Sequence, residues 1–219
     1  MSYLRETDFP RTSPTSAFVQ EVGFLPNVFR AQGLLPRIPE AMAGLASAII
    51  SREQALTRVQ KEIVLLAVAS AYRNAYCSAW HCHSLRALGM PDSQLDQIIV
   101  DHHRAGISRS DTALLDFVRK LATRAPWVSA RDIAVVREHE FTDEAILEAV
   151  VVTALSNLFC TLASGLGPLP DFDPPAIPAA TMASAPDASA FVGGTSGPYL
   201  SGVEGCTEAF PPVLQKRFG

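Results

Sequence analysis

The chain has 219 residues, of which 48% are hydrophobic and 18% are charged, and its formal net charge at pH 7 is −4. This length allows one sizeable hydrophobic core and is too short for two full-sized domains to be expected. The acidic balance leaves no basic stripe, so the electrostatic footprint of a nucleic-acid-binding protein is missing.

Prolines interrupt the first forty residues and limit any helix there to a short segment. We expect helices over residues 16–22 and 27–35, the second with Asn27 as its N-cap and Gly33 at its end. A longer helix is expected over residues 40–50, where apolar residues recur with the helical period.

The strongest helix signal covers residues 57–72. Thr57, followed three residues later by Gln60, matches a capping box. Apolar residues lie on nearly every face of this segment, which is typical of a buried helix. Glu62 lies inside it, and because burying a lone carboxylate is costly, we expect Glu62 to have a partner.

Arg73 and Asn74 interrupt the helical pattern. Asparagine is among the best N-cap residues, so we expect one helix to end near Arg73 and a second to begin at Asn74. The second helix is expected to end near Leu88, with Gly89 as its C′ residue.

Four further helices are expected over residues 93–100, 112–123, 129–138 and 142–163. Ser110 or Asp111 would cap the second of these, and Thr142 would open the last. The last is the most apolar, but its polar residues favour a buried helix over a membrane span. No convincing strand pattern occurs, so the sequence predicts an all-α fold, a compact helical bundle of about eight helices.

The composition changes after residue 168. We expect residues 1–168 to form one all-helical domain and residues 169–219 to form an irregular C-terminal arm rich in proline, alanine and glycine. Scattered aromatic residues suggest that this arm packs on the body or on a neighbouring subunit. A disordered tail is the alternative.

The start of the chain and its cysteines bear on the compartment. Residues 1–10 lack a positive start followed by an apolar core, so we expect no secretory signal and a cytoplasmic protein. The four cysteines (Cys77, Cys82, Cys160 and Cys206) do not suggest a disulfide scaffold and are expected to be reduced.

Glu62, Cys77 and His81 form the main candidate site. With Asn74 as N-cap, Cys77 lies in the first turn of its helix, where unpaired N–H groups and the helix dipole favour a thiolate. His81 lies one turn further on, and Glu62 could orient it from the preceding helix. The ordinary alternative is a small core cysteine beside a hydrogen-bonded histidine.

The stretch from Arg58 to Gly89 resembles the core of the alkylhydroperoxidase D and carboxymuconolactone decarboxylase superfamily, in particular its peroxidase-related branch. The signature of that family is a glutamate, eleven residues, Cys-x-x-Cys, and a histidine four residues after the second cysteine. Glu62, Cys77 and His81 match the glutamate, the second cysteine and the histidine. Asn74 stands where the first cysteine would be. Weaker likeness covers roughly residues 20–168, including Phe24 to Arg30, Pro36 and Asn157.

The resemblance implies an all-helical antioxidant protein that assembles as a dimer, trimer or hexamer. It implies reduction of a small hydroperoxide by the thiolate of Cys77, with Glu62 and His81 relaying protons and an external thiol or thiol protein as reductant. We expect no cofactor, no bound metal, no nucleic acid and no membrane partner.

Asn74 leaves the resolving thiol open. Cys82 is five residues from Cys77 on the same helix, too far and on another face for a disulfide. Cys160 is a possible alternative resolving thiol, although we favour a buried structural role for it. Cys206 would need the arm to fold over the site, and a one-cysteine cycle with an external thiol is the remaining option.

Other functions also fit the pattern. A lyase or decarboxylase acting on a small lactone or acid would use His81 as acid and base. An inactive oligomeric scaffold would account for Asn74. A metal site at Cys77, His81, Cys82 and His83 is disfavoured because the last two point elsewhere. We interpret His102 and His103 as an exposed turn.

Overall fold

The computed structural model describes residues 2–6, 19, 22–173 and 175. Every described helix is α-helical or 3-10, and no strand occurs within these residues, so the expected all-α fold is confirmed. The α-helices are α2 (Asn27–Arg30), α3 (Arg37–Ile50), α4 (Arg58–Ala71), α5 (Ala75–Ala87), α6 (Asp92–Asp101), α7 (Arg109–Arg124), α8 (Ala130–Glu138) and α9 (Asp143–Leu166), and the 3-10 helices are η1 (His102–Arg104) and η2 (Ala125–Trp127). Most of the helix expected over residues 16–22 and most of the expected arm over residues 169–219 lie outside the described residues.

Three expected helix starts were wrong. Helix α3 begins at Arg37, three residues before the expected residue 40. Asn27 is the first residue of α2, and Pro26 is its N-cap. Helix α7 begins at Arg109 because the Ser108 hydroxyl accepts the N–H of Asp111 at 2.9 Å. That hydroxyl also donates to the Asp111 carboxylate at 2.7 Å, so the cap lies earlier than the expected Ser110 or Asp111.

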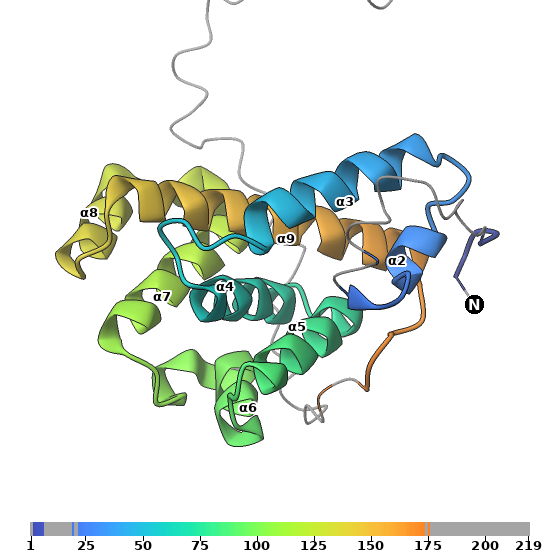
Figure 1. Ribbon diagram of the computed structural model, residues 1–219. Coiled ribbons are helices and arrows are strands. Elements are labelled where there is room, and N and C mark those ends of the chain that lie inside the picture. The colour runs from blue at the N-terminus through green and yellow to red at the C-terminus, as the bar shows by residue number, and fades with distance from the viewer. Residues whose placement is uncertain (1, 7–18, 20–21, 174, 176–219) are drawn as a thin grey trace, which may run out of the picture. The chain divides into compact units, whose positions relative to one another are not determined.

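Helix α4 is the centre of the bundle. It packs against α5, α6, α7 and α9, and nine consecutive residues, 61–69, are buried. Thr57 and Gln60 form the expected capping box at its start. Figure 1 shows α3 and α9 side by side, with α4 and α5 below them.

A three-residue corner joins α4 to α5. Arg73 adopts a left-handed conformation with φ of +53°, and its N–H donates to the Ser70 carbonyl at 2.9 Å. The N–H of Asn74 donates to the Ala69 carbonyl at 3.0 Å, which completes a Schellman motif. Asn74 is then the N-cap of α5, so the predicted break and cap are both confirmed. The corner turns α5 back along α4 and brings His81, in the middle of α5, against Glu62.

Helix α9 is the one described helix that is long and apolar enough to cross a membrane by length and composition, a test that core helices of soluble proteins also pass. It packs against α3, α4, α5, α7 and α8. It ends at Gly167, whose φ is +60° and whose Cα lies so close to the Tyr3 ring that a Cβ would approach ring atoms to 2.5 Å. Glycine therefore suits position 167 for two reasons: it adopts the left-handed conformation without strain, and it has no Cβ to clash with Tyr3.

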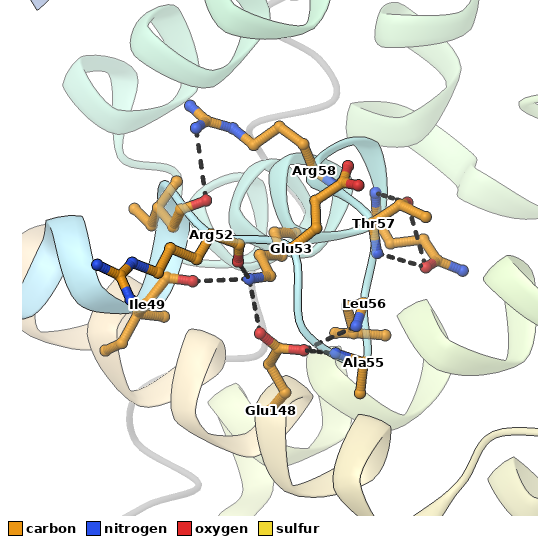
Figure 2. Close-up of polar contacts among 11 residues, drawn as sticks. Ile49, Arg52, Glu53, Ala55, Leu56, Thr57, Arg58 and Glu148 are labelled. Atoms are coloured by element: carbon orange, nitrogen blue, oxygen red, sulfur yellow. Dashed lines mark hydrogen bonds and ion pairs between the residues drawn. The ribbon is translucent and has the colours of Figure 1, made fainter. Parts of the chain in front are cut away.

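A buried ion pair fixes the loop between α3 and α4 (Figure 2). Lys61 is fully buried, and its ammonium lies 2.6 Å from Glu148 on α9. The same ammonium donates to the carbonyls of Ile49, at 2.8 Å, and Arg52. The Glu148 carboxylate also accepts the N–H groups of Ala55, at 2.9 Å, and Leu56, at 2.7 Å. Every charge taken out of water here therefore has close partners.

Candidate active site

Asn74 sets the position of Cys77. Its side-chain oxygen accepts the N–H of Cys77 at 2.8 Å, which places Cys77 as the third residue of α5. Cys77 is 4% exposed. The thiol therefore lies in the first helical turn, where the helix dipole favours negative charge.

Glu62 and His81 contact each other across the α4–α5 corner. The Nδ1 atom of His81 lies 2.9 Å from Oε2 of Glu62. The other carboxylate oxygen accepts two N–H groups of Arg58, at 3.0 Å and 2.8 Å. Since the carboxylate serves as acceptor for Arg58, Nδ1 of His81 carries the proton that it shares with Glu62. Nε2 of His81 is then left as the ring's proton acceptor.

Cys77 and His81 line one small cavity between α3, α5 and α9. Its volume is about 60 Å³, room for a few water-sized groups. Most of its wall is apolar or aromatic; the lining residues are Pro26, Val28, Phe29, Ala46, Ile50, Leu65, Tyr76, Cys77, Trp80, His81, Ser156 and Phe159. The cavity suits a compact reactant with an apolar substituent more than a highly charged one.

The Cys77 thiol has a sulfur partner from another helix. Cys160 on α9 belongs to the same buried apolar cluster, and both thiols are reduced. The neighbouring Cys160 thiol, together with burial, raises the pKa of Cys77, while the Cys77 thiol lowers the pKa of Cys160, helped by Ser156. Cys160 therefore lies beside the candidate site.

The other cysteines are not part of this pair. Cys82 is completely buried in the main core, among residues of α4, α6 and α7, and burial raises its pKa to about 11. Cys77 and Cys160 belong to a second, smaller apolar cluster with Val28, Phe29 and Met42. Cys206 lies outside the described residues.

Residues 169–173 pack over the start of α5. The Asp171 carboxylate accepts the hydroxyl of Tyr76 and, at 3.1 Å, the N–H of Asn27. Burial and this hydrogen bond raise the pKa of Tyr76. Phe172 contacts Trp80 at a ring separation of 5.2 Å and stacks on His83 at 3.7 Å. These contacts hold the aromatic wall of the cavity, and they direct His83 away from Cys77.

The histidine pair at η1 is not the exposed turn that we expected. His102 is buried, and its Nε2 lies 2.8 Å from the Asp116 carboxylate. His103 lies 3.1 Å from the same oxygen. Asp101, His102 and His103 bring possible ligand atoms within 4.8 Å of one another, but the shared bond to Asp116 already explains their clustering.

Sequence reasoning missed three residues of the site. Arg58 lies four residues before Glu62, and Ser156 lies four residues before Cys160, so helical spacing could have identified both. Asp171 lies far along the chain from Tyr76, and no local pattern indicates that contact.

Comparison with known proteins finds the same fold. Residues 36–103 match the model of the carboxymuconolactone decarboxylase family. A peroxidase-related protein with an alkylhydroperoxidase D core from Ralstonia eutropha superposes with a TM-score of 0.67 at 25% identity, over 77% of this chain and 94% of that chain. A peroxidase-related protein from a Silicibacter species gives 0.67 at 22% identity, over 76% and 91%.

A third solved structure, a debrominase in complex with 2,3,4-tribromopyrrole, gives a TM-score of 0.64 at 19% identity, over 83% of this chain and 94% of that chain. At that identity the likeness concerns the fold alone. No match was found among curated proteins.

Proposed function

Since this chain belongs to the alkylhydroperoxidase D and carboxymuconolactone decarboxylase superfamily, we propose that it reduces hydroperoxides, with Cys77 as the attacking thiol. The observation that carries the proposal is the shared cavity. Both the Cys77 thiol and the His81 ring that Glu62 orients line it. A nucleophile, a base and an orienting carboxylate are the groups that thiol-dependent peroxide cleavage requires.

The proposed reaction begins with proton transfer. His81 Nε2 takes the proton of Cys77, and the thiolate attacks one oxygen of the hydroperoxide. A sulfur–oxygen bond forms while the oxygen–oxygen bond breaks, giving a sulfenic acid on Cys77 and an alkoxide. His81 returns its proton to the alkoxide, which leaves as an alcohol. Glu62 stabilises the imidazolium between the two transfers.

The remaining parts of the proposal concern partners. The reductant is an external thiol or thiol protein, and the substrate is a small organic hydroperoxide. We propose a homo-oligomer working in the cytoplasm in antioxidant defence, and no cofactor takes part in the steps above.

The test is hydroperoxide consumption by the purified protein. With cumene hydroperoxide and dithiothreitol, the native protein should consume peroxide, and Cys77→Ser should abolish this. Dimedone should label Cys77 after exposure to peroxide, because it reacts with sulfenic acids. Cys82→Ala is the matched control, since it removes a buried thiol of the same helix outside the cavity. Turnover that survives Cys77→Ser would exclude the thiolate mechanism, and an unreactive native protein would point to a lyase or a scaffold.

A further inference from the structure

One amide joins the backbones of two cysteines from different helices. The side-chain oxygen of Asn74 accepts the N–H of Cys77 at 2.8 Å, while its nitrogen donates to the carbonyl of Cys160 at 3.0 Å. The same nitrogen donates to the Ser164 hydroxyl at 3.0 Å. Asn74 is 6% exposed, so these bonds are shielded from water. The start of α5 and the last turns of α9 are therefore tied together at the level of the two thiols.

The two thiols are in contact, but only one lines the cavity. Cys77 and Cys160 belong to the same buried apolar cluster, and neither is oxidised. Cys77 is part of the cavity wall, whereas Cys160 is not. A hydroperoxide entering the cavity therefore meets Cys77 first, with Cys160 behind it.

We propose that Cys160 is the resolving thiol of this protein and that Asn74 positions it against Cys77. The inference rests on the proposed function, because it needs a sulfenic acid on Cys77. Asn74 stands where the family signature has its first cysteine, and its amide holds in place a thiol from another helix.

The resolving step balances without another oxidant. The Cys160 sulfur attacks the sulfur of the Cys77 sulfenic acid, a sulfur–sulfur bond forms, and the sulfur–oxygen bond breaks. The hydroxide that leaves combines with the Cys160 proton as water. An external dithiol then returns two electrons and two protons and restores both thiols. The two sulfurs must still approach to a bond length of about 2.05 Å, a local movement between residues whose backbones Asn74 already joins.

The surroundings of Cys160 favour this role. The Cys77 thiol lowers the pKa of Cys160, helped by Ser156 one helical turn earlier. A resolving thiol acts as a thiolate, so this environment supports Cys160 as the second nucleophile. Cys82 lies in the main core and has no such partners.

The experiment is a single oxidation with one equivalent of cumene hydroperoxide and no added thiol. The native chain should lose two thiols, and peptide mapping without reduction should find Cys77 linked to Cys160. In Cys160→Ser only one thiol should be lost, and dimedone labelling of Cys77 should rise strongly. Cys82→Ala should behave like the native chain.

The outcomes separate the two proposals. If the native chain loses one thiol and labels with dimedone as strongly as Cys160→Ser, Cys160 does not resolve, while the peroxidase proposal stands. If Cys77 is oxidised in neither protein, the peroxidase proposal fails as well.

Asn74→Ser tests the positioning role. Serine is also a good N-cap, so α5 keeps its start, but the donor to the Cys160 carbonyl is lost. Disulfide formation should slow by a larger factor than sulfenic acid formation on Cys77 does. A purely structural role would change both rates together or neither, so a disulfide rate equal to the native one would refute positioning by Asn74.

Discussion

Lys61 and Glu62 are neighbours on α4, are both almost completely buried, and are both charged, yet they serve different parts of the molecule. Lys61 contacts Glu148 and two loop carbonyls. Glu62 contacts Arg58 and His81, and His81 reaches the cavity that contains Cys77. Burial of a charge therefore does not by itself mark a functional residue. The difference is that His81, the partner of Glu62, lines a cavity that a reactant can occupy, whereas Glu148, the partner of Lys61, does not line that cavity.

The helical turn between adjacent residues explains the divergence. Successive side chains on an α-helix point about 100° apart, so neighbouring residues face different elements. Lys61 points to the loop before α4 and to α9, and Glu62 points to α5. We therefore expect substitutions at Lys61 to change mainly stability and substitutions at Glu62 to change mainly activity.

The largest effect is expected from Lys61→Met. It leaves Glu148 buried without its counterion and should lower the free energy of unfolding by about 3–5 kcal/mol. Thermal unfolding followed by circular dichroism should show a matching fall in Tm. Lys120→Met is the control. Lys120 and Asp132 form a partly exposed ion pair, so the loss of unfolding free energy should be about 0–1 kcal/mol. Equal losses of unfolding free energy in the two variants would show that the buried pair contributes no more than the exposed one.

Glu62→Gln should act on the rate. Without the carboxylate, His81 loses the group that fixes its tautomer, and peroxide consumption should fall by about 10²-fold or more. The initial rate with cumene hydroperoxide measures this. Glu148→Gln removes a partly buried carboxylate outside the cavity and should lower Tm while leaving the rate unchanged. If Glu62→Gln alters only Tm, Glu62 belongs with Lys61 as a structural residue.

The Lys61–Glu148 pair should stabilise the protein at neutral pH and lose this effect in acid. Burial raises the pKa of Glu148, but Lys61 and the N–H groups of Leu56 and Ala55 together lower it by a larger amount, so the net shift of the pKa is downward. A carboxylate whose pKa is lowered in the folded state stabilises the protein at pH values above its ordinary pKa of 4.5. This stability is lost as the pH falls through the folded-state pKa. Urea midpoints of the native chain and Glu148→Gln should therefore differ at pH 7 and converge in acid. A gap that stays constant with pH would contradict the shift.

Arg73→Gly should give the smallest effect, and a favourable one. Arg73 holds a φ of +53° at the corner that brings α5 to Glu62, and glycine adopts this conformation without the Cβ clash. We expect a gain of about 0.5–1 kcal/mol in unfolding free energy and unchanged activity. Arg131→Gly, in the ordinary conformation of α8, should instead cost about 1 kcal/mol. A loss at both sites would mean that the Arg73 side chain itself stabilises the corner.

Helix caps could be predicted from the sequence, but contacts between helices far apart in the chain could not. The capping box of Thr57 and the cap at Asn74 depend on residues three apart, so both were predictable. Ser108 was missed because Ser110 and Asp111 offer equally good caps nearby. The contacts of Lys61 with Glu148 and of Cys77 with Cys160 depend on how α9 slides along α4 and α5, which no local pattern encodes.

The aromatic wall of the cavity also gives the protein its own optical probe. Of the two tryptophans in the chain, Trp80 lines the cavity beside Cys77, and Trp127 is 64% exposed on η2. The two indoles therefore sit in surroundings of different polarity, and their emission should be separable. In Trp127→Phe, the remaining fluorescence would come from Trp80 alone, so a reactant entering the cavity could be followed in real time without a dye.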